Sequence, residues 1–244
     1  MLEILGFSKQ FNGKTVIDDF SLSLGSGSFT VLIGPSGCGK STLFDLLMGS
    51  LPRDGGRLLL HGREIPDLGT FAAYMNQKDL LLPWMSLLDN ALLPVAVKRK
   101  PSAEDRKEAC GLFGDLGLSG YEGHFPGEVS GGMAQRCALA RTLMFHAPLV
   151  LLDEPLSAVD AITRQSLRDL LLLLQEKFGE TMLMITHDVD DALLLADRII
   201  LLSPSPLSVK EVVELASGKP RDGLGSELLS LKRRILSRLR EGER

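Results

Sequence analysis

The stretch "FTVLIGPSGCGKSTLFDLLMG", residues 29–49, decides the fold of this chain. Its first five residues are apolar or β-branched, as is typical of a buried strand, and the apolar residues after position 40 predict a helix. Between them, residues 34–41 fit the pattern G-x-x-x-x-G-K-[ST]. Glycines at these positions allow the backbone to wrap so that its N–H groups point at a phosphate. The sequence therefore predicts a phosphate-binding loop that joins a buried strand to a helix.

Two side chains of this loop are suited to binding a phosphate and its metal ion. Lys40 adds a cation, and one lysine–phosphate pair is worth about 4 kcal/mol before desolvation. Ser41 adds a hydroxyl for Mg²⁺. The alternative is an ordinary glycine-rich turn between a strand and a helix. We expect the nucleotide to be bound by Gly34, Pro35, Ser36, Gly37, Cys38, Gly39, Lys40, Ser41 and Thr42.

Two further apolar runs end in groups that suit nucleotide hydrolysis. In "PLVLLDEP", residues 148–155, Asp153 emerges from a buried strand and is predicted to bind Mg²⁺. Glu154 is predicted to orient and deprotonate the attacking water, an effect of roughly 10²- to 10⁴-fold in rate. His187 follows the strand "TMLMIT" and is expected at the same edge of the sheet, near the γ-phosphate or the water. The alternative for Asp153 and Glu154 is capping of the next helix.

A second pair of glycines occurs in "VSGG", residues 129–132, after a loop and not after a buried strand. Ser130, Gly131 and Gly132 leave a hydroxyl and open N–H groups at a helix N-terminus, which attracts anions. The segment has no lysine, so it is predicted to close over a phosphate that another copy of the chain holds, in a head-to-tail pair. The alternative is a plain serine-capped helix.

The organisation of the chain indicates a parallel sheet covered by helices on both faces, because apolar strands alternate with helical stretches. Short strands are expected in "RLLLHGREI" and "FAAYMNQ", and further strands in "PLVLLD", "TMLMIT" and "RIILLS". We expect a core of about residues 1–77 and 146–204, a helical insertion at about 78–145, and a polar, proline-punctuated tail at about 205–244. The tail ends in a helix with an apolar stripe, which is expected to pack on the protein surface, with contact to a membrane surface or to a permease as the alternative.

Composition limits the classes of function. The chain has 244 residues, 44% of them hydrophobic, and a formal net charge of −4, so no global basic field attracts nucleic acid. The three cysteines share no metal-site spacing and predict free thiols in a reducing compartment. No run approaches the roughly 18 apolar residues of a membrane span, and the N-terminus does not read as a secretory signal. We expect a cytosolic protein unless another protein holds it at a membrane.

Lys40, "VSGG", "LLDEP" and His187, in this order, resemble the ATP-binding subunits of ABC transporters over about the first 204 residues. The resemblance implies an α/β P-loop NTPase fold with a RecA-like core, an N-terminal antiparallel β portion and an inserted helical subdomain, all within one ABC ATPase domain spanning 1–244. It implies that Gln77 contacts Mg²⁺ and that "SAVD", with Asp160, crosses the dimer interface. It also places Phe11 against adenine, where simple core packing is the alternative.

The segment "KDLLLPWMSLLDNALLP", residues 78–94, is similar to a subgroup that imports nitrate, sulfonates and taurine. Three positions depart from the usual family pattern, namely Val129, Met133 and Ala134, and methionine at the second is familiar in that subgroup. The resemblance implies ATP and Mg²⁺ as cofactors, a homodimer beneath a transmembrane permease, and indirectly a solute-binding protein. It implies a position on the inner face of a prokaryotic cell membrane. The permease is expected beside Gln77 and Trp84, with burial of Trp84 in the insertion as the alternative.

Two other classes stay open on the sequence. One is an ABC-type ATPase that acts on nucleic acid, which usually has two ATP-binding domains or a long coiled coil. The other is a P-loop kinase of a small metabolite, which uses Lys40 and Asp153 but has no need of "VSGG" or His187. Stimulation of ATP hydrolysis by a membrane partner, stimulation by nucleic acid, or a phosphorylated metabolite separates the three.

Overall fold

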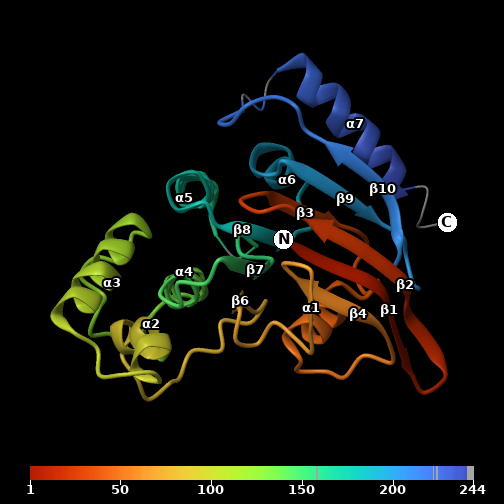
Figure 1. Ribbon diagram of the computed structural model, residues 1–244. Coiled ribbons are helices and arrows are strands. Elements are labelled where there is room, and N and C mark those ends of the chain that lie inside the picture. Colours follow the sequence, from red (N-terminus) through yellow and green to blue (C-terminus); the bar gives the residue numbers. More distant parts are fainter. Residues whose placement is uncertain (158, 222, 224, 241–244) are drawn as a thin grey trace.

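Two sheets and a group of helices make up the molecule (Figure 1). The computed structural model describes residues 1–157, 159–221, 223 and 225–240. One sheet has four strands in the order β2-β1-β4-β5, and the other has six in the order β10-β9-β3-β8-β7-β6. The predicted α/β class is confirmed.

The four-stranded sheet is antiparallel throughout. The sequence predicted one strand in "RLLLHGREI", and this was wrong, because the segment forms a hairpin of two strands. His61 and Gly62 both have left-handed backbones, with φ of 51° and 75°, and two such residues in a row suit a tight hairpin turn. Its strands are β1 (Leu2–Phe11), β2 (Lys14–Leu24), β4 (Gly55–Leu60) and β5 (Arg63–Ile65).

The six-stranded sheet is parallel except at one edge, where β10 runs antiparallel to β9. The sequence missed β10 and expected an irregular polar tail there. An edge strand needs few apolar residues, and Val213 is the one fully buried side chain of this strand. The strands are β3 (Phe29–Ile33), β6 (Ala72–Met75), β7 (Leu149–Asp153), β8 (Thr181–Ile185), β9 (Arg198–Leu202) and β10 (Val209–Glu214).

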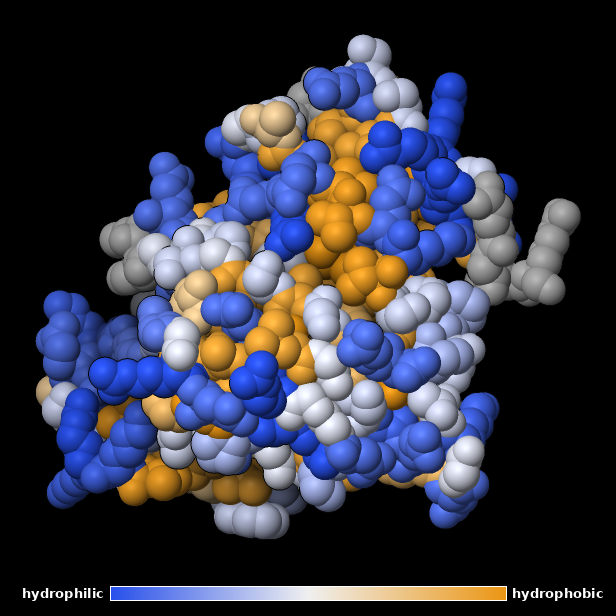
Figure 2. All heavy atoms as spheres, turned by 45° about the vertical axis from the view of Figure 1, so that its right-hand side comes forward, coloured by the Kyte–Doolittle hydropathy of each residue, from blue (hydrophilic) through white to orange (hydrophobic). Residues whose placement is uncertain are grey.

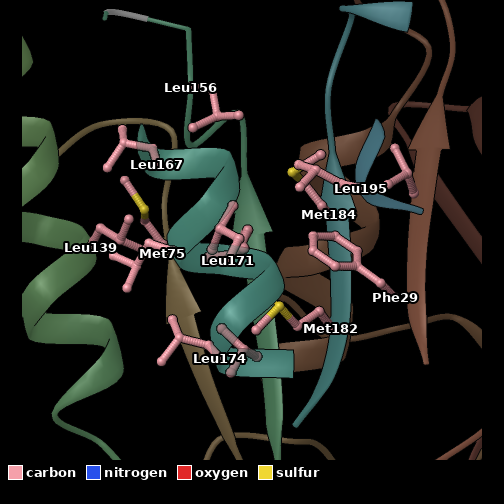
Figure 3. Close-up of a cluster of buried hydrophobic side chains, with 14 of the residues drawn as sticks. Phe29, Met75, Leu139, Leu156, Leu167, Leu171, Leu174, Met182, Met184 and Leu195 are labelled. Carbon is pink, nitrogen blue, oxygen red and sulfur yellow. The ribbon is translucent and has the colours of Figure 1, made fainter. Parts of the chain in front are cut away.

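Side chains of the central strands alternate between two cores, which explains their continuous apolar runs. In β7, Leu149 and Leu151 join a core with α1 (Lys40–Met48) and the antiparallel sheet. Val150 and Leu152 join the core on the opposite face, with α4, α5 and α6. Figure 3 shows the second core, where leucines of α5 (Ala161–Phe178) lie against side chains of the sheet. Both faces of the sheet are therefore covered.

The chain between β6 and β7 is helical and extends to the left in Figure 1. It has a small core of its own, formed by Leu92, Val95, Ala109 and Met144. Ser86 caps the first of its helices by accepting a hydrogen bond of 3.1 Å from the N–H of Asp89. The elements are α2 (Leu87–Ala96), α3 (Ala103–Asp115), the 3₁₀ turn η1 (Pro126–Glu128) and α4 (Gly131–Leu143).

The C-terminal helix α7 (Ser226–Arg240) packs against α6 (Val189–Leu195). Its apolar stripe is buried as expected, with Leu228 at 8% and Ile235 at 0% exposure. Figure 2 shows the face on the right of Figure 1, where hydrophobic side chains gather in a band between hydrophilic ones. Leu229 of α7 and Val212 of β10 stay 40% and 41% exposed. The helix therefore covers this edge only in part.

Candidate nucleotide site

The loop between β3 and α1 needs its glycines. Gly37 and Gly39 have φ of 76° and 112°. Residues with a Cβ atom rarely adopt such positive φ values. At Gly34 a Cβ atom would lie 2.8 Å from Cβ of Leu202. These positions confine the chain to a tight wrap at the carboxyl end of β3, where a helix N-terminus favours an anion.

Lys40 is held inside this wrap. Its ammonium donates hydrogen bonds of 2.8 Å to the carbonyls of both Gly34 and Pro35, and the residue is only 8% exposed. Cys38 is buried beside it, and burial raises the pKa of the Cys38 thiol, so this thiol stays neutral. The loop thus fixes a cation at its centre. The N–H of Cys38 donates a hydrogen bond of 3.4 Å to the carbonyl of Pro35 within the loop.

A cavity of about 520 Å³ opens at this loop. Most of the nucleotide residues predicted from the sequence line it, although they come from distant parts of the chain. Val16 and Ile185 also line it and were not predicted. The lining residues are Phe11, Val16, Ser36, Gly37, Gly39, Lys40, Ser41, Thr42, Gln77, Asp153, Glu154 and Ile185.

Phe11 is 41% exposed and lies at the cavity, with the ammonium of Lys9 at 5.4 Å from the ring centroid. The alternative that Phe11 packs in the core is therefore wrong. An exposed ring at the rim of a phosphate-binding cavity offers a flat apolar surface to a base. Gln77, just beyond the end of β6, lines the same cavity.

Asp153 and Ser41 together fit a magnesium ion. Asp153 ends β7 at 2% exposure. Burial raises the pKa of its carboxyl group, and a hydrogen bond from the Ser41 hydroxyl opposes that rise. Mg²⁺ is commonly held by one or two carboxylates together with substrate phosphates, and this pair of oxygen ligands beside Lys40 matches that pattern.

Glu154 has an unusual backbone, with φ of 51°. Its N–H donates a hydrogen bond of 2.9 Å to the carbonyl of Ile185, the last residue of β8. Its Oε1 lies 3.2 Å from Nδ1 of His187, whose side chain is 63% exposed. The carboxylate and the imidazole therefore meet at the ends of two parallel strands, as expected. Glu154 lines the cavity, whereas His187 is not among its described lining residues.

The "VSGG" segment lies apart from this cavity. Ser130 caps α4 by accepting a hydrogen bond of 3.3 Å from the N–H of Met133. A Cβ at Gly131 would meet nothing within 4 Å. Ser130, Gly131 and Gly132 are absent from the lining of the cavity in the described part of the chain. One chain therefore carries both groups of predicted residues without bringing them together.

Asp160 also lies outside the cavity lining. Its carboxylate accepts hydrogen bonds of 3.0 and 2.7 Å from the N–H and hydroxyl of Thr163, so it caps the start of α5. Ala158, in the same predicted interface loop, lies outside the described residues. The three cysteines, Cys38, Cys110 and Cys137, have free thiols. That prediction is confirmed.

One polar contact at Glu154 was not predicted at all. Gln135 of α4 donates a hydrogen bond of 3.0 Å to the carbonyl oxygen of Glu154. The sequence gives little sign of this contact. Gln135 is a polar residue next to Ala134 and close to Cys137, both of which are buried in the structure.

Comparison with known proteins agrees with this geometry. The family model described as ABC transporter matches residues 17–157. The aliphatic sulfonates import ATP-binding protein SsuB 1 of Pseudomonas savastanoi is 40% identical over 96% of this chain and 93% of its own length. The taurine import ATP-binding protein TauB of Yersinia pestis is 36% identical over 90% and 86%. A dimeric ATP-binding cassette solved with ADP and Pi superposes with a TM-score of 0.81 at 27% identity, covering 89% of this chain and 100% of that one.

Proposed function

The chain belongs to the ABC transporter family, and we propose that its ATP hydrolysis energises the import of a small sulfonate of the taurine or alkanesulfonate type. The names of the relatives SsuB and TauB support this substrate class. The sequence resemblance also suggested nitrate, and we favour a sulfonate because both of these relatives are named for sulfonate or taurine import. The main support for ATPase activity is that Lys40, Asp153 and Glu154 line the same cavity.

In the proposed site, Lys40 and the loop N–H groups bind the phosphates of ATP, and Phe11 stacks on adenine. Ser41, Gln77 and Asp153 would hold Mg²⁺, which neutralises charge on the β- and γ-phosphate oxygens. Glu154 takes a proton from the attacking water. His187, at 3.2 Å from that carboxylate, orients it and contacts the γ-phosphate.

A second copy of the chain completes this site. Ser130, Gly131 and Gly132 of that copy close over the γ-phosphate, and Asp160 crosses the interface between the copies. A dimeric cassette among the structural relatives supports such a pair. ATP binding closes the pair and hydrolysis reopens it.

We place the permease beside Gln77 and Trp84. Trp84 is 71% exposed and Leu80 is 57% exposed, so the alternative that Trp84 is buried in the helical insertion is wrong. Exposed apolar side chains suit a partner helix. Among the helices that the structure describes, none could span a membrane. Because its relatives are named as import ATP-binding proteins, we assign the chain to the cytoplasmic face of the cell membrane. A solute-binding protein selects the substrate.

The two other classes are not favoured. The longest helix among the described residues is α5, with 18 residues, so these residues contain no long coiled coil of the kind found in chromosome-associated ATPases. If the chain were a metabolite kinase, the N-terminal end of α4, which is suited to binding an anion, would have no role.

The first experiment tests the base. Glu154→Gln is expected to retain ATP binding and to lose turnover by roughly 10²-fold or more, because the amide cannot accept the proton of water. Glu64→Gln, which neutralises an exposed carboxylate of β5, is the control. Parental turnover in Glu154→Gln contradicts the assignment.

The second experiment tests the substrate class. The chain is assembled with its permease in proteoliposomes, and ATP hydrolysis is measured with binding protein preincubated with taurine, an alkanesulfonate or nitrate. We expect stimulation by a sulfonate. Stimulation by nitrate alone contradicts the proposed class while leaving the ATPase assignment intact.

A further inference from the structure

The backbone of Glu154 is held in a conformation that few residues with a side chain adopt. Its φ of 51° is in the left-handed region, which disfavours residues with a Cβ atom. Such a backbone persists only where its surroundings fix it. The direction of the Glu154 carboxylate therefore depends on the groups that bind its peptide units.

Three donors bind the carbonyl oxygen of Glu154. Nε2 of Gln135 lies at 3.0 Å, the hydroxyl of Ser157 at 3.0 Å, and the N–H of Ser157 at 3.3 Å. The two serine donors belong to the turn that Glu154 itself begins. Gln135 is different, because it comes from another element and ties this turn to α4.

Gln135 is well placed to act as a rigid anchor. It is 5% exposed, and Ala134 and Cys137 beside it on α4 are 5% and 0% exposed. Its Nε2 also lies 3.4 Å from the hydroxyl of Ser157. A buried amide with these contacts has little rotational freedom, so its position follows that of the helix.

We propose that Gln135 is a positioning residue that fixes the backbone of Glu154 and so aims its carboxylate at the attacking water. This inference rests on the proposed role of Glu154 as the base. The same helix begins at Ser130, the anion-binding end assigned to the partner's nucleotide. Gln135 thereby joins the two half-sites of one chain, and displacement of α4 displaces the donor that holds Glu154.

The test is Gln135→Met, which keeps the length and apolar packing of the side chain and removes the donor. We expect kcat for ATP to fall about tenfold, equal to about 1.4 kcal/mol, while KM stays within about twofold. Thr142→Val is the matched control, because Thr142 is also buried on α4 but its hydroxyl donates to the carbonyl of Ala138, at 2.9 Å, and not to Glu154. The control is expected to keep the parental kcat.

A second background separates positioning from general damage. In Glu154→Gln, Gln135→Met is expected to leave the residual hydrolysis rate unchanged and to preserve ATP-driven dimers, because the carboxylate it positions is already gone. An equal loss of rate in both backgrounds overturns the inference and indicates a structural defect. Ser157→Ala, which removes another donor from the same carbonyl at an exposed position, is expected to lower kcat about threefold and serves if Gln135→Met does not fold.

The outcomes distinguish this inference from the function it rests on. Parental kcat in both Gln135→Met and Ser157→Ala, with Glu154→Gln inactive, overturns the role of Gln135 alone. Parental turnover in Glu154→Gln overturns the base assignment and the inference with it.

Discussion

Glu180 is expected to make the stability of the protein depend on pH, at a position separate from its nucleotide site. The residue lies between α5 and β8, at the start of the strand, whereas the cavity lies at the strand's other end. Its Oε2 atom is buried and has no hydrogen-bond partner among the residues that the structure describes. Burial raises the pKa of this carboxyl group from 4.5 to about 7.

A raised pKa means that the folded chain keeps this proton where the unfolded chain has released it. From about pH 4.5 to about pH 7 the free energy of unfolding therefore falls as the pH rises, and the loss persists above that range. A shift of this size corresponds to ~3 kcal/mol for a group shielded from water. Water still reaches part of Glu180, which reduces the effect to about 1 kcal/mol.

Glu180→Gln removes the charge and keeps the shape. Urea unfolding at several pH values is expected to give a gain of about 1 kcal/mol at about pH 8, shrinking toward zero near pH 4.5. Glu176→Gln, at an exposed position of α5, is the control and is expected to change stability by less than about 0.5 kcal/mol. A gain that is equal at every pH, or no gain at pH 8, refutes the reasoning. ATP turnover is expected to stay at the parental rate.

Three other substitutions address the site and its partners. Lys40→Ala is expected to weaken ATP binding at least tenfold, or about 1.4 kcal/mol, measured by calorimetric titration, because it removes the cation at the centre of the loop. Gly132→Asp, made in the Glu154→Gln background, is expected to keep ATP affinity in the monomer and to abolish ATP-driven dimers in light scattering, because a carboxylate then faces the partner's phosphate. Trp84→Ala is expected to weaken permease binding at least tenfold in a pull-down titration, without lowering the unfolding midpoint, since the side chain is 71% exposed.

Each of these substitutions has a matched control. Lys107→Ala removes an exposed lysine of α3, Gly111→Asp adds a carboxylate at an exposed glycine of the same helix, and Phe71→Ala removes another exposed ring. Unchanged ATP affinity in Lys40→Ala contradicts the phosphate loop. If Gly132→Asp still forms dimers at the ATP concentration that the parent needs, then "VSGG" is only a helix cap. Permease binding lost equally in Phe71→Ala means that Trp84 is not the specific contact.

The sequence predicted those parts of the site that depend on local geometry. A buried strand followed by glycines and Lys40 predicts the phosphate loop because strand, turn and helix are contiguous in the chain. Asp153 follows from a rule about parallel sheets, whose strands present their carboxyl ends at one edge, whereas Gln77 was implied only by the resemblance to the family. The structure brings both residues to the cavity on that edge.

The parts that were missed depend on contacts between distant segments. β10 exists because its backbone pairs with β9, and a short edge strand with one buried side chain leaves little pattern. The hairpin of β4 and β5 needed a left-handed His61, a conformation that histidine adopts only in some contexts. Gln135 bonds a backbone carbonyl, and a carbonyl has no side-chain signature that a sequence pattern can pair with it.

The anchoring of α4 also explains why one chain cannot close its own site. Gln135 binds the carbonyl of Glu154 at 3.0 Å, and Arg141 of the same helix donates 2.9 Å and 2.6 Å hydrogen bonds to the carbonyls of Leu80 and Asp79. Bringing Ser130 over the chain's own phosphate loop would require breaking both attachments, and that end of α4 does not line the cavity. A second copy can cover the nucleotide while α4 stays in place. On the proposed roles, the Gln135 contact that holds Glu154 for water also helps to keep α4 in place, so that closure is an event between two chains.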